Sequence, residues 1–310
     1  MPVPNPKSNT IGLIVGREQD WPIAFMSELE ARDTETTAEF VKLGGTFLDD
    51  VCPYPVLFDR MSHEIPYYRT YVKYAALNGA YIINNPFVWS ADNRFFGTTI
   101  ANRLGLRSPR TIVLPNKDTL AETVPDSFRN LEYPMNWEGI TDYIGVPAIF
   151  KEILSGGRRL SFRVNSVDQL IQRYDESGTR TMILQEVVQG GEHIHCLVIG
   201  MENALILQYA PEQDRYLPAI AVDYDTKTQI VESAIALTKA YGYDINLIEF
   251  NHQDGELVVI NSTNPSPVID RQLFNEVQFN WIVTQTVDLA LARQREPLPQ
   301  RIPFNLVTRD

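Results

Sequence analysis

Cysteine and long apolar runs are what this sequence most clearly lacks. Its 310 residues contain only Cys52 and Cys196, which stand far apart and do not have the spacing of metal ligands. Sparse cysteine is typical of a reducing compartment, so we expect a cytoplasmic protein. No stretch approaches the ~18 apolar residues of a membrane-spanning helix. The opening MPVPNPKSNT has no apolar segment of a secretory signal, so we expect no membrane partner.

Positive charge is also scarce. Lysine and arginine total 27 against 39 aspartate and glutamate residues, which gives a net charge of −12. Nucleic acids and anionic membranes repel such a chain, so we expect neither as its main partner. With 44% hydrophobic and 21% charged residues, the composition is globular, and the length allows two or three modest domains.

Two common nucleotide-binding motifs are absent. The apolar segment TIGLIVG at 10–16 is followed by Arg-Glu-Gln rather than a glycine-rich turn, so a nicotinamide dehydrogenase is not expected. The segment SGGRRLS at 155–161 is not a P-loop, because it has no Gly-Lys-Ser/Thr ending.

Strands and helices alternate up to about residue 107, which predicts a small parallel α/β unit. The expected strands are TIGLIVG, GTFLDDV, PVLFDR and AYIINNP. The expected helices cover 65–80, with Ile65, Tyr68, Val72 and Ala76 on the buried face, and 90–106, with Ser90 as N-cap.

The rest of the chain has an α+β texture, with antiparallel strands and helices packed outside them. The expected strands are 146–154, SFRV, 181–188, EHIHCLVIG, ALILQYA and a hairpin within 247–265, and the expected helices begin at SVDQLIQRY and cover 225–241 and roughly 270–294.

The hairpin LIEFNHQDGELVVINSTNP has an acidic residue inside its first strand. A three-residue loop at 254–256 would pair Phe250 with Ile260 and place Glu249 opposite Asn261. A two-residue turn would instead place Glu249 opposite Ile260, so we expect the longer loop.

That register would create an oxygen-rich face of Glu249, Asn261 and Asn264. Mg²⁺ commonly takes one or two carboxylates together with substrate phosphates, so this face is a candidate metal site. The alternative is an ordinary solvated face of a hairpin.

A lysine and a glycine pair suggest an anion site. Lys151 lies within the apolar strand AIFKEIL, where an ammonium is costly unless it meets an anion. Gly156 and Gly157 would let backbone amides approach a phosphate, with Arg158 and Arg159 beside them. The alternatives are a solvated edge-strand lysine and a plain hairpin turn.

The segment QEVVQGGE at 185–192 ends a strand and exposes its backbone beside Val188. Such an edge can hydrogen-bond adenine, and Glu192 can bind ribose hydroxyls. The alternative is a simple strand-turn-strand connection.

The order of these features resembles the ATP-grasp superfamily, especially its glutathione synthetase, ribosomal-protein glutamate ligase and D-alanine–D-alanine ligase branch. The segments FDRMSHEIPYYR, INNPFVWSADNRFF and GYDINLIEF…INSTNPSP are similar to bacterial ATP-grasp proteins of unassigned substrate. The resemblance covers about 55–290. It implies an ATP-grasp fold with a parallel α/β pre-ATP-grasp domain at 1–107, a small lid subdomain at 108–187, a larger antiparallel-sheet subdomain at 188–298 and a tail at 299–310.

The resemblance implies an ATP- and Mg²⁺-dependent ligase that joins a carboxylate to an amine or thiol through an acylphosphate. The substrates would be small molecules or peptides, and a homodimer is compatible with the fold. The implied roles are phosphate contact for Lys151, a phosphate-covering lid for Gly156 and Gly157, an adenine hinge for Gln185, Glu186 and Val188, ribose contact for Glu192, γ-phosphate contact for Arg215, and Mg²⁺ binding for Glu249, Asn261 and Asn264.

Three positions depart from the pattern that the resemblance implies. Arg94 stands where a lysine is usual, His195 where an arginine is usual and Asn261 where an acidic ligand is usual. Arg94 keeps the charge but not the geometry, and His195 is largely neutral at pH 7 unless a phosphate raises its pKa. The alternative function is therefore a catalytically attenuated or inactive nucleotide-binding relative with a regulatory or scaffold role.

The acceptor side is defined more loosely. Asp59, Arg60, Ser62 and His63 follow a strand of the first domain and could touch substrate, as could Arg271. The alternatives are a helix-cap neighbour for His63 and the start of the last helix for Arg271. His193 and His195 share a strand face but lack a close third ligand, which favours a structural role over zinc binding.

Overall fold

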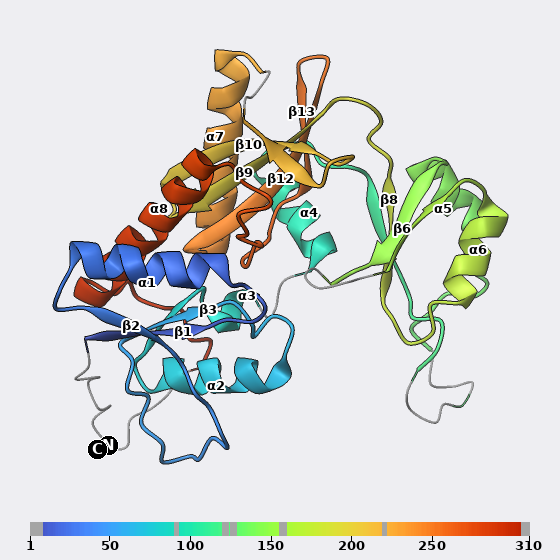
Figure 1. Ribbon diagram of the computed structural model, residues 1–310. Helices are drawn as coiled ribbons and strands as arrows, with labels where there is room; N and C mark the ends of the chain where they lie inside the picture. Colours follow the sequence, from blue (N-terminus) through green and yellow to red (C-terminus); the bar gives the residue numbers. More distant parts are fainter. Residues whose placement is uncertain are drawn as a thin grey trace.

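The computed structural model contains a parallel sheet, a five-stranded antiparallel sheet and a separate four-stranded antiparallel sheet (Figure 1). It describes residues 9–89, 93–119, 124, 129–154, 160–218 and 222–304. Within these residues, no helix combines the length and apolar character needed to cross a bilayer.

The first sheet is parallel and has the order β2-β1-β3-β4. Its side chains alternate between two apolar layers, because both faces are covered by helices. Leu13 and Phe58 pack beneath α1, whereas Leu57 and Ile82 pack beneath α2. The elements are β1 (Thr10–Ile14), α1 (Asp20–Arg32), β2 (Thr37–Phe40), β3 (Val56–Asp59), α2 (Pro66–Leu77), β4 (Tyr81–Ile83) and α3 (Pro86–Trp89).

Several details of this unit differ from the sequence predictions. GTFLDDV is a loop, and the second strand is instead TAEF, whose paired positions are only partly buried. Helix α2, which was predicted at 65–80, buries Tyr71, Val72, Ala75 and Ala76, whereas Ile65 precedes the helix as N-cap and is exposed. Ser90 lies outside the described residues, and the side chain of Asn93 caps α4 by accepting from the Phe96 amide.

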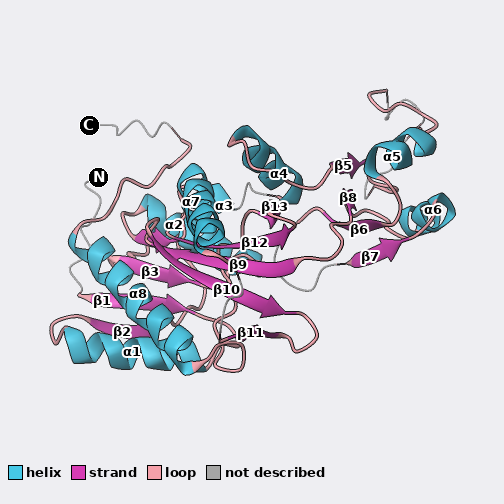
Figure 2. Ribbon diagram, turned by 90° about the horizontal axis from the view of Figure 1, so that it is seen from above, coloured by secondary structure: helices cyan, strands magenta, loops and turns pink. Residues whose placement is uncertain are grey.

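The five-stranded sheet has the order β11-β10-β9-β12-β13 and is antiparallel throughout. One face packs against α7 and α4, and the other packs against α8, α1 and the parallel sheet (Figure 2). The elements are α4 (Arg94–Arg103), β9 (Glu192–Ile199), β10 (Asn203–Ala210), β11 (Arg215–Leu217), α7 (Tyr224–Tyr241), β12 (Ile245–Gln253), β13 (Glu256–Asn261) and α8 (Glu276–Arg295).

The parallel and five-stranded sheets share a core. Trp21 and Phe58 belong to the same apolar cluster as Leu197 and Ile245. Asn84 fastens this junction: its side chain accepts from the Ile245 amide at 2.9 Å and donates to the Ile245 carbonyl at 2.8 Å. These two layers therefore form one packed body.

The remaining sheet, the lid, stands apart from that body and has its own core (Figure 1). Its antiparallel order is β5-β8-β6-β7, with α5 and α6 packed on one face. The opposite face is left for contacts with the rest of the molecule. The elements are β5 (Thr111–Leu114), α5 (Trp137–Ile144), β6 (Ala148–Glu152), β7 (Ser161–Val164), α6 (Val167–Asp175) and β8 (Met182–Glu186).

The β12–β13 hairpin corrects the predicted loop. Gln253 pairs with Glu256, so the turn has two residues, Asp254 and Gly255, both with positive φ as a tight hairpin turn requires. A β-bulge between Glu249 and Phe250 then takes up the extra residue on β13. The pairing of Glu249 with Asn261 is confirmed, although its cause is the bulge and not a longer loop.

Candidate functional site

Lys151 and Gln185 lie on the face of the lid that its helices leave uncovered. Alternation along β6 and β8 buries Phe150 and Leu184 against α5 and α6 and turns Lys151 and Gln185 the other way. Lys151 Nζ donates to Gln185 Oε1 at 2.7 Å, and Gln185 Nε2 donates to Thr111 Oγ1 at 3.0 Å. The chain of bonds fixes the ammonium at the lid surface.

The environment of Lys151 favours an anion. Burial and the neighbouring Arg94 charge lower the pKa of Lys151 to about 8, although Glu249 partly opposes this shift. Its hydrogen bond goes to the neutral carboxamide of Gln185, which cannot offset the ammonium charge. A phosphate or carboxylate of a ligand would supply that charge.

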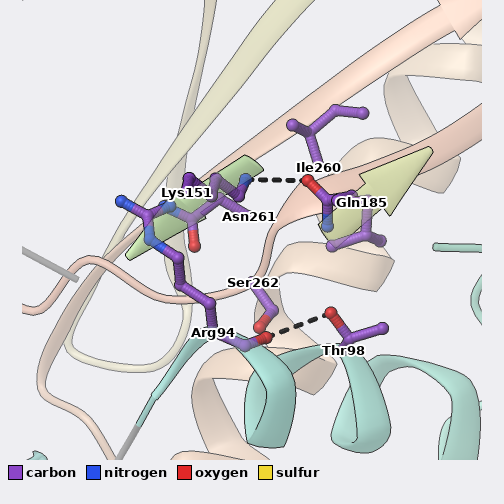
Figure 3. A pocket seen from close by; sticks show the side chains of 8 residues that line it. Arg94, Thr98, Lys151, Gln185, Ile260, Asn261 and Ser262 are labelled. Carbon is purple, nitrogen blue, oxygen red and sulfur yellow. Dashed lines mark hydrogen bonds between the residues drawn. The ribbon is translucent and has the colours of Figure 1, made fainter. Parts of the chain in front are cut away.

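A narrow pocket joins the lid to the edge of the five-stranded sheet (Figure 3). Lys151 from β6 and Gln185 from β8 meet there beside Asn261 of β13 and Arg94 of α4. The Arg94 amide donates to the Ile153 carbonyl at 2.9 Å, so α4 is fastened to the end of β6. Lys151 of the predicted lid strand and Asn261 of the predicted hairpin therefore line the same pocket.

Glu249 is the centre of the adjoining sheet face. It pairs with Asn261 on one side and with His195 on the other, so all three side chains share a face. Asn261 Nδ2 donates to Glu249 Oε1 at 3.2 Å. Asn264 lines a hollow beside Glu249 and His195, but its Oδ1 already accepts from the Ser266 amide at 3.2 Å.

The donor set fits a metal only in part. Among the described residues, no group of three or more His, Cys, Asp or Glu side chains is arranged to hold an ion. Glu249 with the amide oxygen of Asn261 would suit Mg²⁺ that arrives with phosphate oxygens, because such ions need few protein ligands. Asn264 is a weaker candidate, since its oxygen is engaged.

His195 is held by two tyrosines that the sequence analysis did not single out. Its Nδ1 lies 2.9 Å from the Tyr216 hydroxyl, and its ring stacks on Tyr209 with centroids 4.9 Å apart. Burial lowers the pKa of His195, with Glu249 opposing the shift, so the imidazole is neutral near pH 7. Leu207 pairs with His195, so alternation along β10 would have placed Tyr209 on this face.

The predicted adenine and ribose residues lie at the end of β8, in the following connection and at the start of β9. The Glu186 side chain is on the helix-covered face, where Arg110 Nη2 contacts Oε1 at 3.1 Å. The Glu186 amide donates to the Arg110 carbonyl at 2.9 Å. Val188 is half-buried, and Glu192 lies 3.7 Å from His252. Gly156 and Gly157 lie outside the described residues.

The predicted acceptor residues near β3 make hydrogen bonds within the fold. The buried Asp59 carboxylate accepts from the Met61 and Ser62 amides and from the Ser62 hydroxyl. Arg60 pairs with Glu18 at 2.5 Å and also donates to the Pro267 carbonyl. These bonds hold Asp59, Arg60 and Ser62 in place, and their contact with substrate stays a prediction.

The other predicted acceptor and phosphate residues are spread out. His63 lies 3.7 Å from its neighbour Glu64, and burial lowers the pKa of His63. Arg271 is exposed, with its guanidinium 4.2 Å from the centre of the Phe279 ring. Arg215 is exposed on β11 and alternates with Tyr216, which turns it away from the tyrosine face.

Comparison with solved structures identifies the fold. D-alanine–D-alanine ligase from Bacillus anthracis in complex with ATP is 14% identical, with a TM-score of 0.64 over 93% of this chain and 98% of that one. A RimK domain ATP-grasp protein from Sphaerobacter thermophilus is 15% identical, with a TM-score of 0.66 over 91% and 99%. The ligase PsnB, bound to precursor peptide PsnA2 and AMPPNP, is 16% identical, with a TM-score of 0.60 over 93% and 99%.

This chain therefore has the ATP-grasp fold, as the resemblance in its sequence predicts. No family model and no curated protein matches the sequence.

Proposed function

We propose that this protein is an ATP-dependent ligase that forms a carbon–nitrogen bond. The observation that carries the proposal is the partly buried ammonium of Lys151, which faces the Glu249–Asn261 pair across the boundary between lid and sheet. An ammonium opposite a metal-type oxygen pair suits a polyphosphate, whose negative charge both sides would neutralise. The solved ligases of this fold include one complexed with ATP and one with AMPPNP.

In this proposal ATP lies between the lid and the five-stranded sheet. Lys151 contacts its phosphates, Gly156 and Gly157 cover them, and Arg94 adds a second positive charge near Lys151. Mg²⁺, held by Glu249 and Asn261 with help from Asn264, would neutralise phosphate charge. The remaining assignments are adenine contact for Gln185 and the backbone of Glu186 and Val188, ribose contact for Glu192, and γ-phosphate contact for His195. Arg215 would join His195 there if its exposed side chain turned around the edge strand β11 toward the tyrosine face.

The proposed reaction begins with a carboxylate that takes the γ-phosphoryl group and becomes an acylphosphate. An amine then attacks the acyl carbon and displaces inorganic phosphate, so one C–N bond forms. Small-molecule and peptide acids are both part of the proposal, and the ligase PsnB of this fold is bound to a precursor peptide. A homodimer and a cytoplasmic location remain part of the proposal.

We also propose the division into a pre-ATP-grasp domain at 1–107, a lid at 108–187 and a large subdomain at 188–298. One observation argues for moving α4 from the first part to the last. Ala101 of α4 is fully buried in the core under α7, and Gly97 lies against Ser262.

A second candidate function is nucleotide binding with weak or absent turnover. It is favoured by the neutral imidazole of His195 and by the single carboxylate in the predicted metal site. Exchanging Asn261→Asp and His195→Arg would then raise turnover if catalysis is only attenuated, and would leave it at zero in a scaffold protein.

Hydroxylamine trapping tests the ligase proposal without knowledge of the amine. The protein is incubated with Mg²⁺-ATP, hydroxylamine and pooled carboxylic acids, and hydroxamate and ADP are measured. The ligase proposal predicts equal amounts of both from at least one acid. ATP binding without hydroxamate or ADP from any pool would contradict it and favour the silent nucleotide binder.

A further inference from the structure

The sheet face continues past Glu249 into a second, larger hollow. It has a volume of about 460 Å³, which is enough for a small organic group. Its lining includes Glu249 and Asn264, so it directly adjoins the predicted metal face. A ligand there would lie next to the proposed site of phosphoryl transfer.

Aromatic rings form one wall of this hollow. His195 is stacked on Tyr209, and Tyr216 meets the His195 ring edge-on with centroids 5.5 Å apart. Tyr216 is itself stacked on Phe274 at 4.8 Å, which holds the wall in place. Faces of tyrosine rings attract organic cations.

Two carboxylates and two histidines, His193 and His195, line the hollow. Asp214 and Glu249 border the hollow, and the described lining includes no lysine or arginine. Tyr209 donates its hydroxyl to Asp214 Oδ1 at 2.6 Å, which fixes that carboxylate beside the aromatic wall. A carboxylate ligand would be repelled, and an ammonium attracted.

The remaining wall is apolar and comes from Leu247, Val268 and Leu273. Such side chains would pack against methylene groups rather than against a second polar group. The hollow thus combines an alkyl wall, an aromatic wall and two carboxylates.

We propose that this hollow is the acceptor subsite and that it takes an aliphatic primary ammonium group with no carboxylate next to it. A simple alkylamine or a lysine side chain meets this description, whereas a free α-amino acid does not. The acceptor role rests on the proposed ligase function, but the binding preference does not.

Ligand-observed NMR titrations with n-butylammonium, n-butanol and butyrate test the preference at constant chain length. Butylammonium is expected to bind about tenfold more tightly than butanol, and butyrate more weakly than both. Equal or tighter binding of butanol or butyrate would overturn the proposal.

Two variants tie the preference to this hollow. Asp214→Asn removes the charge, and asparagine tolerates the positive φ of 48° found there, so the turn is kept. Asp214→Asn and Tyr209→Leu should each weaken butylammonium binding several-fold, whereas Glu212→Gln in the same turn should not. Unchanged binding in both test variants would overturn the proposal.

Hydroxamate formation tests the ligase function separately from the ammonium preference of the hollow, because hydroxylamine is small and neutral and does not need an ammonium subsite. Selective butylammonium binding without any hydroxamate would contradict the ligase function and leave the binding preference standing. Hydroxamate formation without selective butylammonium binding would overturn the subsite alone.

Discussion

At the residue scale, the central feature is the partly buried ammonium of Lys151, whose hydrogen bond among the described residues goes to the carboxamide of Gln185. Lys151 has a pKa of about 8 because burial and Arg94 both disfavour its charged form. ATP phosphates would raise that pKa again. Between the pKa of Lys151 in the free protein and its higher pKa in the ATP complex, the complex keeps a proton that the free protein has lost. ATP affinity must therefore fall as pH rises above about 8.

Calorimetric titrations of Mg²⁺-ATP across this pH range measure the effect. The expected decline approaches tenfold per pH unit, with proton uptake visible as a dependence on buffer ionisation enthalpy. Lys151→Arg should bind ATP more weakly but show no such decline, because a guanidinium stays charged. An affinity of the unchanged protein that is constant above pH 8 would contradict this role for Lys151.

Asn261 governs the predicted metal site. Asn261→Asp would place two carboxylates opposite each other on β12 and β13, which raises the attraction for Mg²⁺. We expect Mg²⁺ to bind the ATP complex about tenfold more tightly, measured by titrating Mg²⁺ at saturating ATP. Asn203→Asp, on an exposed position of β10, is the matched control. Equal Mg²⁺ affinity in the two variants would place the metal elsewhere.

At the element scale, the bulge in β13 decides which residues face the site. The alternation of apolar residues correctly predicts the hairpin and the pairing of Glu249 with Asn261. It could not reveal that a tight Asp254-Gly255 turn and a bulge together produce that pairing, since both arrangements satisfy the same apolar pattern. The local apolar pattern predicts which face of the sheet a side chain lies on, but it does not predict the type of turn or the presence of a bulge.

The packing of α4 on the hairpin depends on Gly97. A Cβ at this position would lie 2.5 Å from Ser262 Oγ and 3.0 Å from the Tyr241 hydroxyl. Gly97→Ala should therefore lower the free energy of unfolding by about 1 to 3 kcal/mol, although alanine favours helix formation. Urea denaturation measures this change.

Ser262→Ala provides the matched partner variant, because it removes the nearest atom in the way. The double variant should recover part of the loss, which gives a favourable coupling energy in a double-mutant cycle. Strictly additive effects would mean that α4 does not rest on Ser262 as described.

At the scale of the whole molecule, the lid has a core separate from those of the main body. The parallel and five-stranded sheets share one core, whereas the lid has its own. Asn84→Ala would leave the Ile245 amide and the Ile245 and Pro265 carbonyls without this partner. We expect this to destabilise the main body by about 2 to 4 kcal/mol.

Native-state hydrogen exchange distinguishes the two parts. Amides of β9 and β12 should exchange faster in Asn84→Ala, whereas those of β6 and β8 should keep their protection. Equal loss of protection in both sheets would mean that the lid does not have an independent core.

The sequence predicts most of this architecture but not its acceptor end. The strand–helix alternation, the lid strands and the hairpin follow from local apolar patterns, and the motifs on them indicate the fold. Helix α1 and strand β2 were missed, because α1 has mixed polarity and β2 is short and half-buried. The structural roles of Asp59 and Arg60 depend on partners such as Glu18 and Pro267, and sequence spacing does not reveal such contacts.

The most direct test of the account is calorimetry of Mg²⁺-ATP binding to the unchanged protein, to Lys151→Ala and to Lys117→Ala. Lys117 also lies in the lid but pairs with Asp175 at its surface, away from the proposed phosphate site. The account predicts that ATP binds the unchanged protein and Lys117→Ala equally and that Lys151→Ala has lost detectable binding. Equal ATP affinity in Lys151→Ala would contradict the proposed site between the lid and the sheet.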